Sequence, residues 1–136
     1  MVYVTRKGQF CAAHRLFNPG WTAEKNAAVF GKCNNPNGHG HNYEIEVTVA
    51  GDPPRETGMV IDLKKLADIL EAEIIEKVDH KHMNEDVDFM SGCIPTAENM
   101  AIAFWKILES KIPEGKLFSI KLSESGNNYV EYRGEA

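Results

Sequence analysis

Residues 43–50 alternate strictly between apolar and polar side chains, and this pattern constrains the fold more than any other feature of the chain. The apolar positions are Tyr43, Ile45, Val47 and Val49. Successive side chains of a strand point to opposite faces, so the segment predicts a strand with one buried face. The segment is therefore expected to be a half-buried strand, whose apolar face packs on the core.

The segments around this strand are predicted from weaker signals. A first strand is expected over residues 2–16, which begin with alternating apolar and polar side chains. Residues 17–42 are rich in turn formers and predict an irregular loop. Residues 59–61 follow a Gly-Asp-Pro-Pro turn and are expected to form a short hairpin partner for the strand.

The second half of the chain contains both helical and extended patterns. Apolar side chains recur at helical spacing over residues 63–78, and Asp62 is the expected N-cap. A second helix is expected to begin after the N-cap Thr96. Residues 117–122 and 129–132 predict a closing strand pair. The order of these elements predicts an α+β fold in which two helices cover one face of an antiparallel sheet.

Length and composition restrict the classes of function. The chain of 136 residues is expected to form a single domain over residues 1–136. A formal charge of −5 without a basic stripe argues against nucleic-acid binding. No apolar run approaches the ~20 residues of a membrane-spanning helix, so no membrane partner is expected. The N-terminal residues lack the apolar core of a signal peptide, which predicts a cytoplasmic location.

The cysteines are odd in number, and no two of them have C-x-x-C spacing; they are Cys11, Cys33 and Cys93. This pattern argues against a disulfide framework and against a four-cysteine zinc site. Cys11 and Cys93 are assigned to packing. Cys33 leaves three alternatives open, because it lies in a polar loop six residues before His39: a packed thiol, a metal ligand or a general base.

Four of the five histidines form two H-x-H pairs, His39 with His41 and His80 with His82. Residues i and i+2 of extended backbone point the same way, so such a pair aims two imidazoles at one ion. His14, on the first strand, is the expected third ligand. Three histidine ligands leave one position of a zinc ion open, which is the arrangement of catalytic zinc sites. The alternative is that these histidines are surface or hydrogen-bonding side chains.

Asp79 and His80 follow the first predicted helix and have two readings. A histidine at this place is explained by the helix dipole alone. Alternatively, Asp79 orients His80, and His80 accepts the proton of Cys33. Glu124, ahead of a turn, and Glu98, in the first turn of a helix, have ordinary readings as a solvated charge and as a dipole partner.

Residues 31–43, which read GKCNNPNGHGHNY, closely resemble the signature of the 6-pyruvoyl tetrahydropterin synthases. The agreement continues in order along essentially the whole chain, through residues 12–16, 57–60, 78–80, 95–99 and 132–135. Six matches in register are far more specific than any one of these motifs alone.

The resemblance implies a zinc enzyme and assigns roles to the residues that match. The implied zinc ligands are His14, His39 and His41. Cys33 matches the general base, and Asp79 with His80 matches its relay. The implied substrate is 7,8-dihydroneopterin triphosphate, whose side-chain hydroxyls zinc would bind as a Lewis acid. Cys33 would move protons along the side chain while inorganic triphosphate is eliminated.

The resemblance also implies how the substrate is bound. Glu124 matches the carboxylate that binds the pterin edge, where two parallel N–H donors meet two oxygens. Glu98 and Thr96 are expected to line the same pocket. Arg15, which follows a zinc ligand, is a candidate contact for the triphosphate.

The fold implied by the resemblance is the tunnelling fold, a four-stranded antiparallel sheet with two helices on one side. Three subunits join their sheets into a barrel, and two trimers stack into a homohexamer with active sites at subunit interfaces. In this chain Ala101, Ile102 and Trp105 widen the apolar surface of the second helix, which agrees with burial against a neighbour.

The family has two branches that use this substrate. One makes 6-pyruvoyl tetrahydropterin for tetrahydrobiopterin biosynthesis, and the other, 6-carboxy-5,6,7,8-tetrahydropterin synthase of queuosine biosynthesis, also loses a two-carbon fragment. Five residues separate Cys33 from His39, as in the biopterin branch, which is therefore expected. Ala97 stands where many relatives have a hydroxyl residue and would alter one pterin contact. A non-enzyme alternative, an inactive pterin-binding protein, is disfavoured because every catalytic position holds a competent residue.

Overall fold

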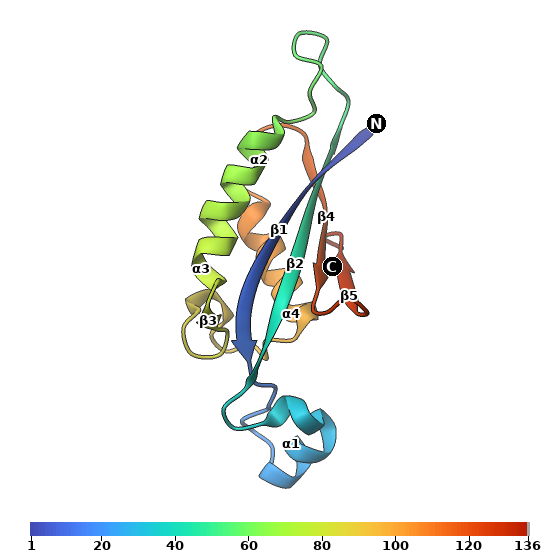
Figure 1. Cartoon of the computed structure of the whole chain (residues 1–136). Coiled ribbons are helices and arrows are strands. Elements are labelled where there is room, and N and C mark those ends of the chain that lie inside the picture. Colours follow the sequence, from blue (N-terminus) through green and yellow to red (C-terminus); the bar gives the residue numbers. More distant parts are fainter. Residues whose placement is uncertain (136) are drawn as a thin grey trace.

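Two long strands form the centre of the structure and carry the predicted zinc ligands. They are β1 (Val2–His14) and β2 (His39–Gly51), which pair antiparallel along their whole length. The computed structural model, which describes residues 1–135, places them in a five-stranded sheet of order β3-β1-β2-β4-β5 (Figure 1). β4 (Lys116–Ser123) pairs antiparallel with β2, and β5 (Tyr129–Tyr132) pairs antiparallel with β4.

The sheet differs from the four-stranded antiparallel sheet that was expected. The additional strand, β3 (Lys81–His82), runs parallel to β1 and pairs only with Ala12 and Ala13. It is held by the N–H groups of His80 and Met83, which donate to β1 carbonyls at 2.6 and 2.7 Å. A two-residue strand has no periodicity that a sequence pattern reveals, so only the tertiary structure shows it.

The predicted strand at residues 59–61 is wrong. β2 lies between β1 and β4 in the sheet and has no free edge for a hairpin partner. Val60 and Ile61 instead place their side chains in the core, where they are 5% and 2% exposed. The short apolar run therefore indicated burial and not strand pairing.

Two helical segments pack on the sheet, and both predicted N-caps are confirmed. The helical elements of this layer are α2 (Leu63–Leu70), a π-helical turn (Glu71–Ile75), α3 (Glu76–Val78) and α4 (Ala97–Leu108). The carboxylate of Asp62 accepts the N–H of Lys64 at 2.9 Å. The hydroxyl of Thr96 accepts the N–H of Asn99 at 3.1 Å. Each cap satisfies a backbone donor that has no partner within its own helix.

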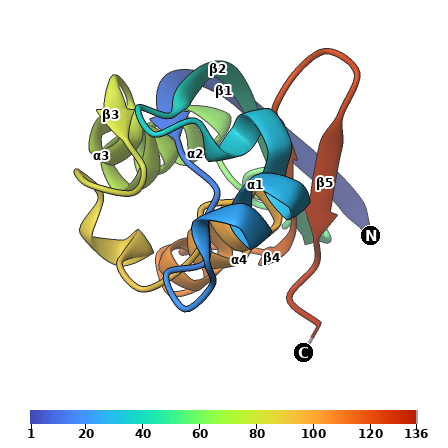
Figure 2. The ribbon, with the colours of Figure 1, turned by 90° about the horizontal axis from the view of Figure 1, so that it is seen from below.

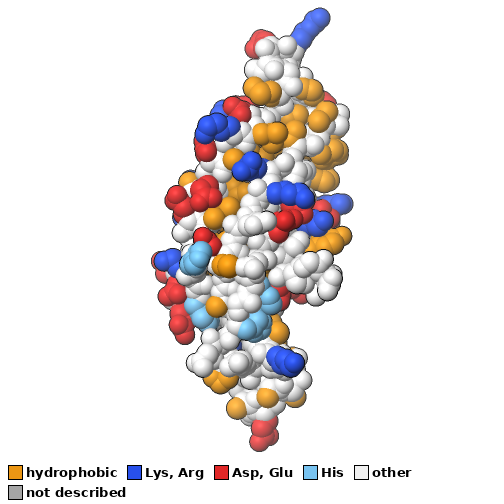
Figure 3. Space-filling view, viewed as in Figure 1, with side chains coloured by type: hydrophobic (Ala, Val, Ile, Leu, Met, Phe, Trp, Pro, Cys, Tyr) orange, Lys and Arg blue, Asp and Glu red, His pale blue; other side chains and the backbone are white. Residues whose placement is uncertain are grey.

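The apolar faces of the sheet and the helices meet in one core. Its fully buried members include Tyr43, Ile45, Val47, Val49, Leu66, Leu70, Ile74, Phe104, Leu108, Ile120 and Leu122. The polar side chains of the same strands face the other way, where Lys121 and Lys7 lie 3.6 and 3.9 Å from Glu46. In the view of Figure 3, basic and acidic side chains are interspersed across the surface.

The additional apolar surface of α4 packs within the chain. Ala101 and Trp105 are buried, and the Trp105 ring lies 5.6 Å from the ring of Tyr132 in an edge-to-face contact. The interpretation of this surface as contact area for a neighbouring subunit is therefore wrong for these two residues. No helix among residues 1–135 is long and apolar enough to cross a membrane.

The chain between β1 and β2 forms a lobe at one end of the sheet (Figures 1 and 2). The lobe contains α1 (Ala23–Phe30) and a short 3₁₀ helix (Gly31–Asn34), where an irregular loop was expected. Asn26 is the buried residue of α1, so this helix has no apolar stripe that periodicity could reveal. The strand after the lobe begins at His39, earlier than the alternation at residues 43–50 indicated.

Candidate metal centre and active site

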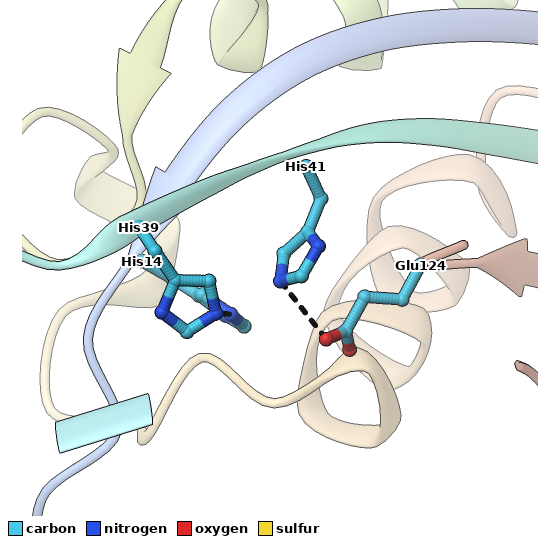
Figure 4. Close-up of side chains that lie close together, drawn as sticks. All are labelled: His14, His39, His41 and Glu124. Carbon is cyan, nitrogen blue, oxygen red and sulfur yellow. Dashed lines mark hydrogen bonds and ion pairs between the residues drawn. The ribbon is translucent and has the colours of Figure 1, made fainter. Parts of the chain in front are cut away.

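Strand register brings the three predicted histidine ligands together. His14 ends β1 and lies directly opposite His39, which begins β2. His41 follows two residues later in β2, so its side chain points to the same face of the sheet. Facing side chains of paired strands lie about 5 Å apart at Cβ. Two strand ends are therefore sufficient to gather three imidazoles (Figure 4).

The cluster includes one carboxylate, and its ligand atoms are close enough to share an ion. Nε2 of His14 lies 3.3 Å from Nε2 of His39. Glu124, which follows β4, places Oε1 3.0 Å from Nε2 of His41 (Figure 4). One ligand atom from each of these four residues lies within 4.8 Å of all the others.

His14 is oriented by its backbone surroundings. Its side chain is fully buried, and its Nδ1 donates to the carbonyl of Pro95 at 2.8 Å. Because a carbonyl only accepts, the proton belongs on Nδ1, and Nε2 presents its lone pair to the cluster. Burial lowers the pKa of His14 below its ordinary value, which keeps the imidazole neutral.

His41 presents an unsatisfied nitrogen to the same space. Its Nε2 is buried and has no hydrogen bond among the described residues, although the Glu124 carboxylate is near. The carboxylate oxygen lies at ion-pair distance without the alignment that a hydrogen bond requires. Burial lowers the pKa of His41, while the charge of Glu124 opposes this effect. A buried nitrogen without a partner is unusual in a native structure and calls for a ligand.

The geometry and protonation of the cluster fit a zinc ion. Two nitrogens that bind Zn²⁺ at about 2.0–2.1 Å in a tetrahedral site lie roughly 3.3–3.4 Å apart. The two facing nitrogens of His14 and His39 lie 3.3 Å apart. Neutral imidazole is the form that binds metal, and imidazole with carboxylate is a donor set that suits zinc. The four residues therefore form a candidate metal site.

Two groups that support the cluster were not predicted from the sequence. The carbonyl of Pro95 accepts from His14, and the hydroxyl of Tyr43 lies 3.4 Å from the same Nδ1. Burial first, and then the charge of Glu124, raise the pKa of Tyr43 well above its ordinary value, so its hydroxyl stays protonated. The alternation along β2 does indicate that Tyr43 shares a face with His41. No pattern in the sequence indicates the Pro95 contact.

Cys33 lies in the lobe, beside one member of the cluster. Its half-buried side chain lines a hollow together with Gly31, Lys32, Asn35 and His39. Its Sγ does not belong to the four-residue cluster among residues 1–135. The structure therefore brings Cys33 near the metal site through His39, and its role as general base stays a prediction.

Asp79 and His80 form a pair beside the edge of β1 that faces away from β2. Asp79 accepts the N–H of Cys11 at 2.9 Å and lies 3.0 Å from Nδ1 of His80. The N–H of Cys11 and then the His80 side chain lower the pKa of the Asp79 carboxyl. His80 has a left-handed backbone, with φ of 61°, and its side chain is 81% exposed. His80 and Cys33 line different hollows of one chain and share no hydrogen bond in the described part.

The remaining predicted residues, Thr96, Glu98 and Arg15, are not members of the four-residue cluster. Thr96 follows Pro95, the partner of His14, while Glu98 is exposed in the first turn of α4. The Arg15 side chain bonds to Asn34, at 3.1 Å from Nε and 3.2 Å from Nη2. The substrate contacts assigned to these residues stay predictions. The assignment of two cysteines to packing is wrong, because both are exposed: Cys11 and Cys93.

Comparison with known proteins decides the family. Residues 3–135 match the family model described as 6-pyruvoyl tetrahydropterin synthase. The chain belongs to this synthase family. A human relative named 6-pyruvoyl tetrahydrobiopterin synthase is 43% identical over 132 residues, which cover 97% of this chain and 91% of the relative.

Solved structures of the synthase family share the fold described above. The structure of Caenorhabditis elegans 6-pyruvoyl tetrahydropterin synthase aligns with a TM-score of 0.93 and 36% identity, and covers 98% of this chain and 96% of that chain.

A relative from Rickettsia bellii, named 6-carboxy-5,6,7,8-tetrahydropterin synthase, is 29% identical over 150 residues, which cover 96% of this chain and 99% of the relative. Both named branches of the synthase family are therefore represented among the relatives.

Proposed function

We propose that this chain is a zinc-dependent lyase that converts 7,8-dihydroneopterin triphosphate to 6-pyruvoyl tetrahydropterin and inorganic triphosphate. The observation that carries the proposal is the convergence of three imidazoles and one carboxylate at the paired ends of β1 and β2. The similarity of the chain to the human relative named for this reaction supports the same conclusion.

Three histidines would hold the zinc, through the nitrogens that face one another in the cluster: His14, His39 and His41. Zinc bound there would supply a Lewis acid for the hydroxyl groups of the substrate side chain. Pro95 and Tyr43 would hold the orientation of His14, as outer partners do for histidine ligands in metal sites.

Glu124 would bind the pterin rather than complete the metal shell. Its carboxylate approaches His41 without a hydrogen bond, so both oxygens remain able to accept parallel N–H donors from the pterin edge. Glu98 and Thr96, at the start of α4, would line the same pocket next to Pro95.

Cys33 would act as the general base, and Asp79 with His80 would accept its proton. The pair lies on a separate hollow of the same chain, and the His80 imidazole is 81% exposed. We therefore place His80 of one copy against Cys33 of another, in a homohexamer built as a dimer of trimers.

The outer edge of β1 supports such an assembly. β3 pairs with only two residues of β1, and the rest of this edge has no strand partner among residues 1–135. A long edge strand with free backbone groups is a place where a further strand can pair. A second copy of the chain would supply that strand.

The proposal is tested by identifying the pterin product. Zinc-loaded protein is incubated with 7,8-dihydroneopterin triphosphate, and the products are separated by chromatography. We expect a pyruvoyl side chain and release of inorganic triphosphate. A carboxyl product would assign the chain to the 6-carboxy-5,6,7,8-tetrahydropterin synthase branch, and binding without product would make it a pterin-binding protein.

The Cys33→Ala variant tests the proposed base. Removing a positioned general base typically costs about 10²- to 10⁴-fold in turnover, and Sγ lies outside the metal cluster. We therefore expect a loss of this size in kcat with an unchanged zinc content by atomic emission. Retained turnover would remove Cys33 from the mechanism.

A further inference from the structure

Arg15 connects the end of β1 to the turn that carries Cys33. Its Nε donates to the backbone carbonyl of Asn34 at 3.1 Å, and its Nη2 donates to the side-chain oxygen of Asn34 at 3.2 Å. Its guanidinium carbon lies 4.5 Å from the centre of the Phe17 ring. The planar guanidinium presents its donors in a rigid fork, so these contacts together define one position for the side chain.

The turn around Cys33 has few other contacts that hold it. The 3₁₀ helix Gly31–Asn34 buries no side chain, and no side-chain hydrogen bond caps its start. One backbone hydrogen bond ties it to the lobe entrance, from the N–H of Leu16 to the carbonyl of Cys33 at 2.7 Å. The guanidinium of Arg15 thus supplies the side-chain contacts that hold the residue after Cys33.

Arg15 is itself anchored to a third segment of the chain. Its N–H donates to the side-chain oxygen of Asn84, and its carbonyl accepts from the Asn84 amide nitrogen, both at 2.8 Å. His14, the preceding residue, belongs to the metal cluster. These hydrogen bonds fix the position of the Arg15 backbone relative to the cluster. The Arg15 side chain in turn fixes the position of the Cys33 turn relative to that backbone.

We propose that Arg15 is a positioning residue that, through Asn34, sets the place of Cys33 relative to the histidine cluster. The role rests on the proposed function, in which Cys33 is the base. A misplacement of about 1 Å in a reacting group costs on the order of 100-fold in rate. The role differs from a triphosphate contact, because Nε and Nη2 of Arg15 are already bonded to Asn34.

The experiment compares Arg15→Gln and Arg15→Lys in a Cys11→Ser, Cys93→Ser background, in which Cys33 is the one cysteine. In both variants we expect kcat to fall about 10- to 100-fold and KM to stay within about threefold. The rate of Cys33 alkylation by iodoacetamide, measured without substrate, should change by about threefold or more. Lysine should not rescue the function, because its ammonium is a point charge that does not reproduce the two-bond fork.

The Asn34→Ala variant tests the same Arg15–Asn34 contact by changing the acceptor residue instead of the donor. It removes one of the two acceptors and keeps the backbone carbonyl, so its effect should be smaller than that of Arg15→Gln. Combined with Arg15→Gln it should add less than about twofold, because both changes act on one interaction. Multiplicative effects in the double variant would overturn the proposal.

Lys25→Gln is the matched control for charge. Lys25 lies in the same lobe, with its ammonium 4.2 Å from the centre of the Trp21 ring, and it has no hydrogen bond to Asn34. This variant should leave kcat and Cys33 alkylation unchanged. Rescue by Arg15→Lys, a rise in KM larger than the fall in kcat, and weaker inhibition by inorganic triphosphate would assign Arg15 to the substrate instead. If the unsubstituted protein proves inactive, the proposed function fails, while the alkylation rates still decide whether the contact of Arg15 with Asn34 positions Cys33.

Discussion

At the scale of single residues, His14 shows how the fold orients a candidate metal ligand. Full burial favours its neutral form, and the Pro95 carbonyl selects the tautomer whose Nε2 faces the cluster. Neither effect needs the metal to be present. The free energy that orients the His14 imidazole is therefore supplied by folding. A metal ion that binds there would not have to supply it, so its affinity would be higher.

Removing this ligand should abolish stable zinc binding. We expect His14→Ala to lose zinc on dialysis against a weak chelator, because only two of the three proposed imidazole ligands remain, and Glu124 is assigned to the pterin. The His80→Ala variant is the control, since its exposed imidazole lies outside the cluster and its zinc content should not change. Equal zinc content in both variants would contradict the assignment of the site.

The metal-free protein should lose stability as the pH falls below 6.5. Burial lowers the pKa of His14 and of His41 from the ordinary value of 6.5. In that range the unfolded chain takes up protons that the folded chain does not, so acid favours unfolding. Urea unfolding of metal-free protein on both sides of pH 6.5 measures this slope. We expect a shallower slope in His14→Gln, and an unchanged slope would contradict the stated origin.

The convergence of the three histidines could be predicted from the chemistry of short segments, while the roles assigned to them stay predictions. The spacing of His39 and His41 indicates that they point the same way, and their pairing with His14 follows once the strands align. The support from Pro95 was not predictable, because 81 residues separate it from His14. A contact across that distance depends on where α4 packs, which no local pattern encodes.

At the scale of elements, Gly38 determines the conformation of the turn that leads into β2. Its φ is +74°, and a Cβ there would lie 2.7 Å from the carbonyl oxygen of His14 and 2.8 Å from Nε2 of His82. The turn before His39 therefore needs both the left-handed backbone and the missing side chain. This turn sets the point at which the two histidine-bearing strand ends meet.

The Gly38→Ala variant should be destabilised by more than about 1 kcal/mol and should bind zinc more weakly. The backbone oxygen of His14 is not free to move away, so the strain falls on the turn and on His39. Gly126→Ala is the matched control, since a Cβ there meets no atom within 4 Å. We expect it to change the free energy of unfolding by less than about 0.5 kcal/mol in urea titrations. Equal stabilities of the two variants would contradict this account.

Elements with a long periodic pattern were predicted, and those without one were not. The caps at Asp62 and Thr96 and the amphipathic helices after them were found from the sequence and are confirmed. α1 was missed because it buries a polar residue, Asn26, instead of an apolar stripe. β3 was missed because its two residues are held by hydrogen bonds to β1, which only the folded chain supplies.

At the scale of the whole molecule, the separation of Cys33 from His80 predicts complementation between inactive variants. Cys33→Ala and His80→Ala should each be inactive alone. If each site takes Cys33 from one copy and His80 from another, random mixing restores both residues in about a quarter of the sites, one half times one half. We therefore expect co-expressed and co-purified variants to regain up to about 25% of the activity. Mixed oligomers that are confirmed to contain both variants but recover no activity would contradict the two-copy site.

Sequence patterns alone were enough to predict the α+β class, both long helices with their caps, and the three histidines of the candidate metal cluster. These features depend on periodicity and on chemistry within a few neighbouring residues. The folded chain was needed to find the five-stranded order, the lobe with α1, the Pro95 and Tyr43 contacts to His14, and the Arg15 contact to Asn34. α1 was missed because it lacks an apolar stripe, whereas the strand order and the contacts join segments that are apart in the chain, where packing and hydrogen-bond satisfaction determine which groups meet.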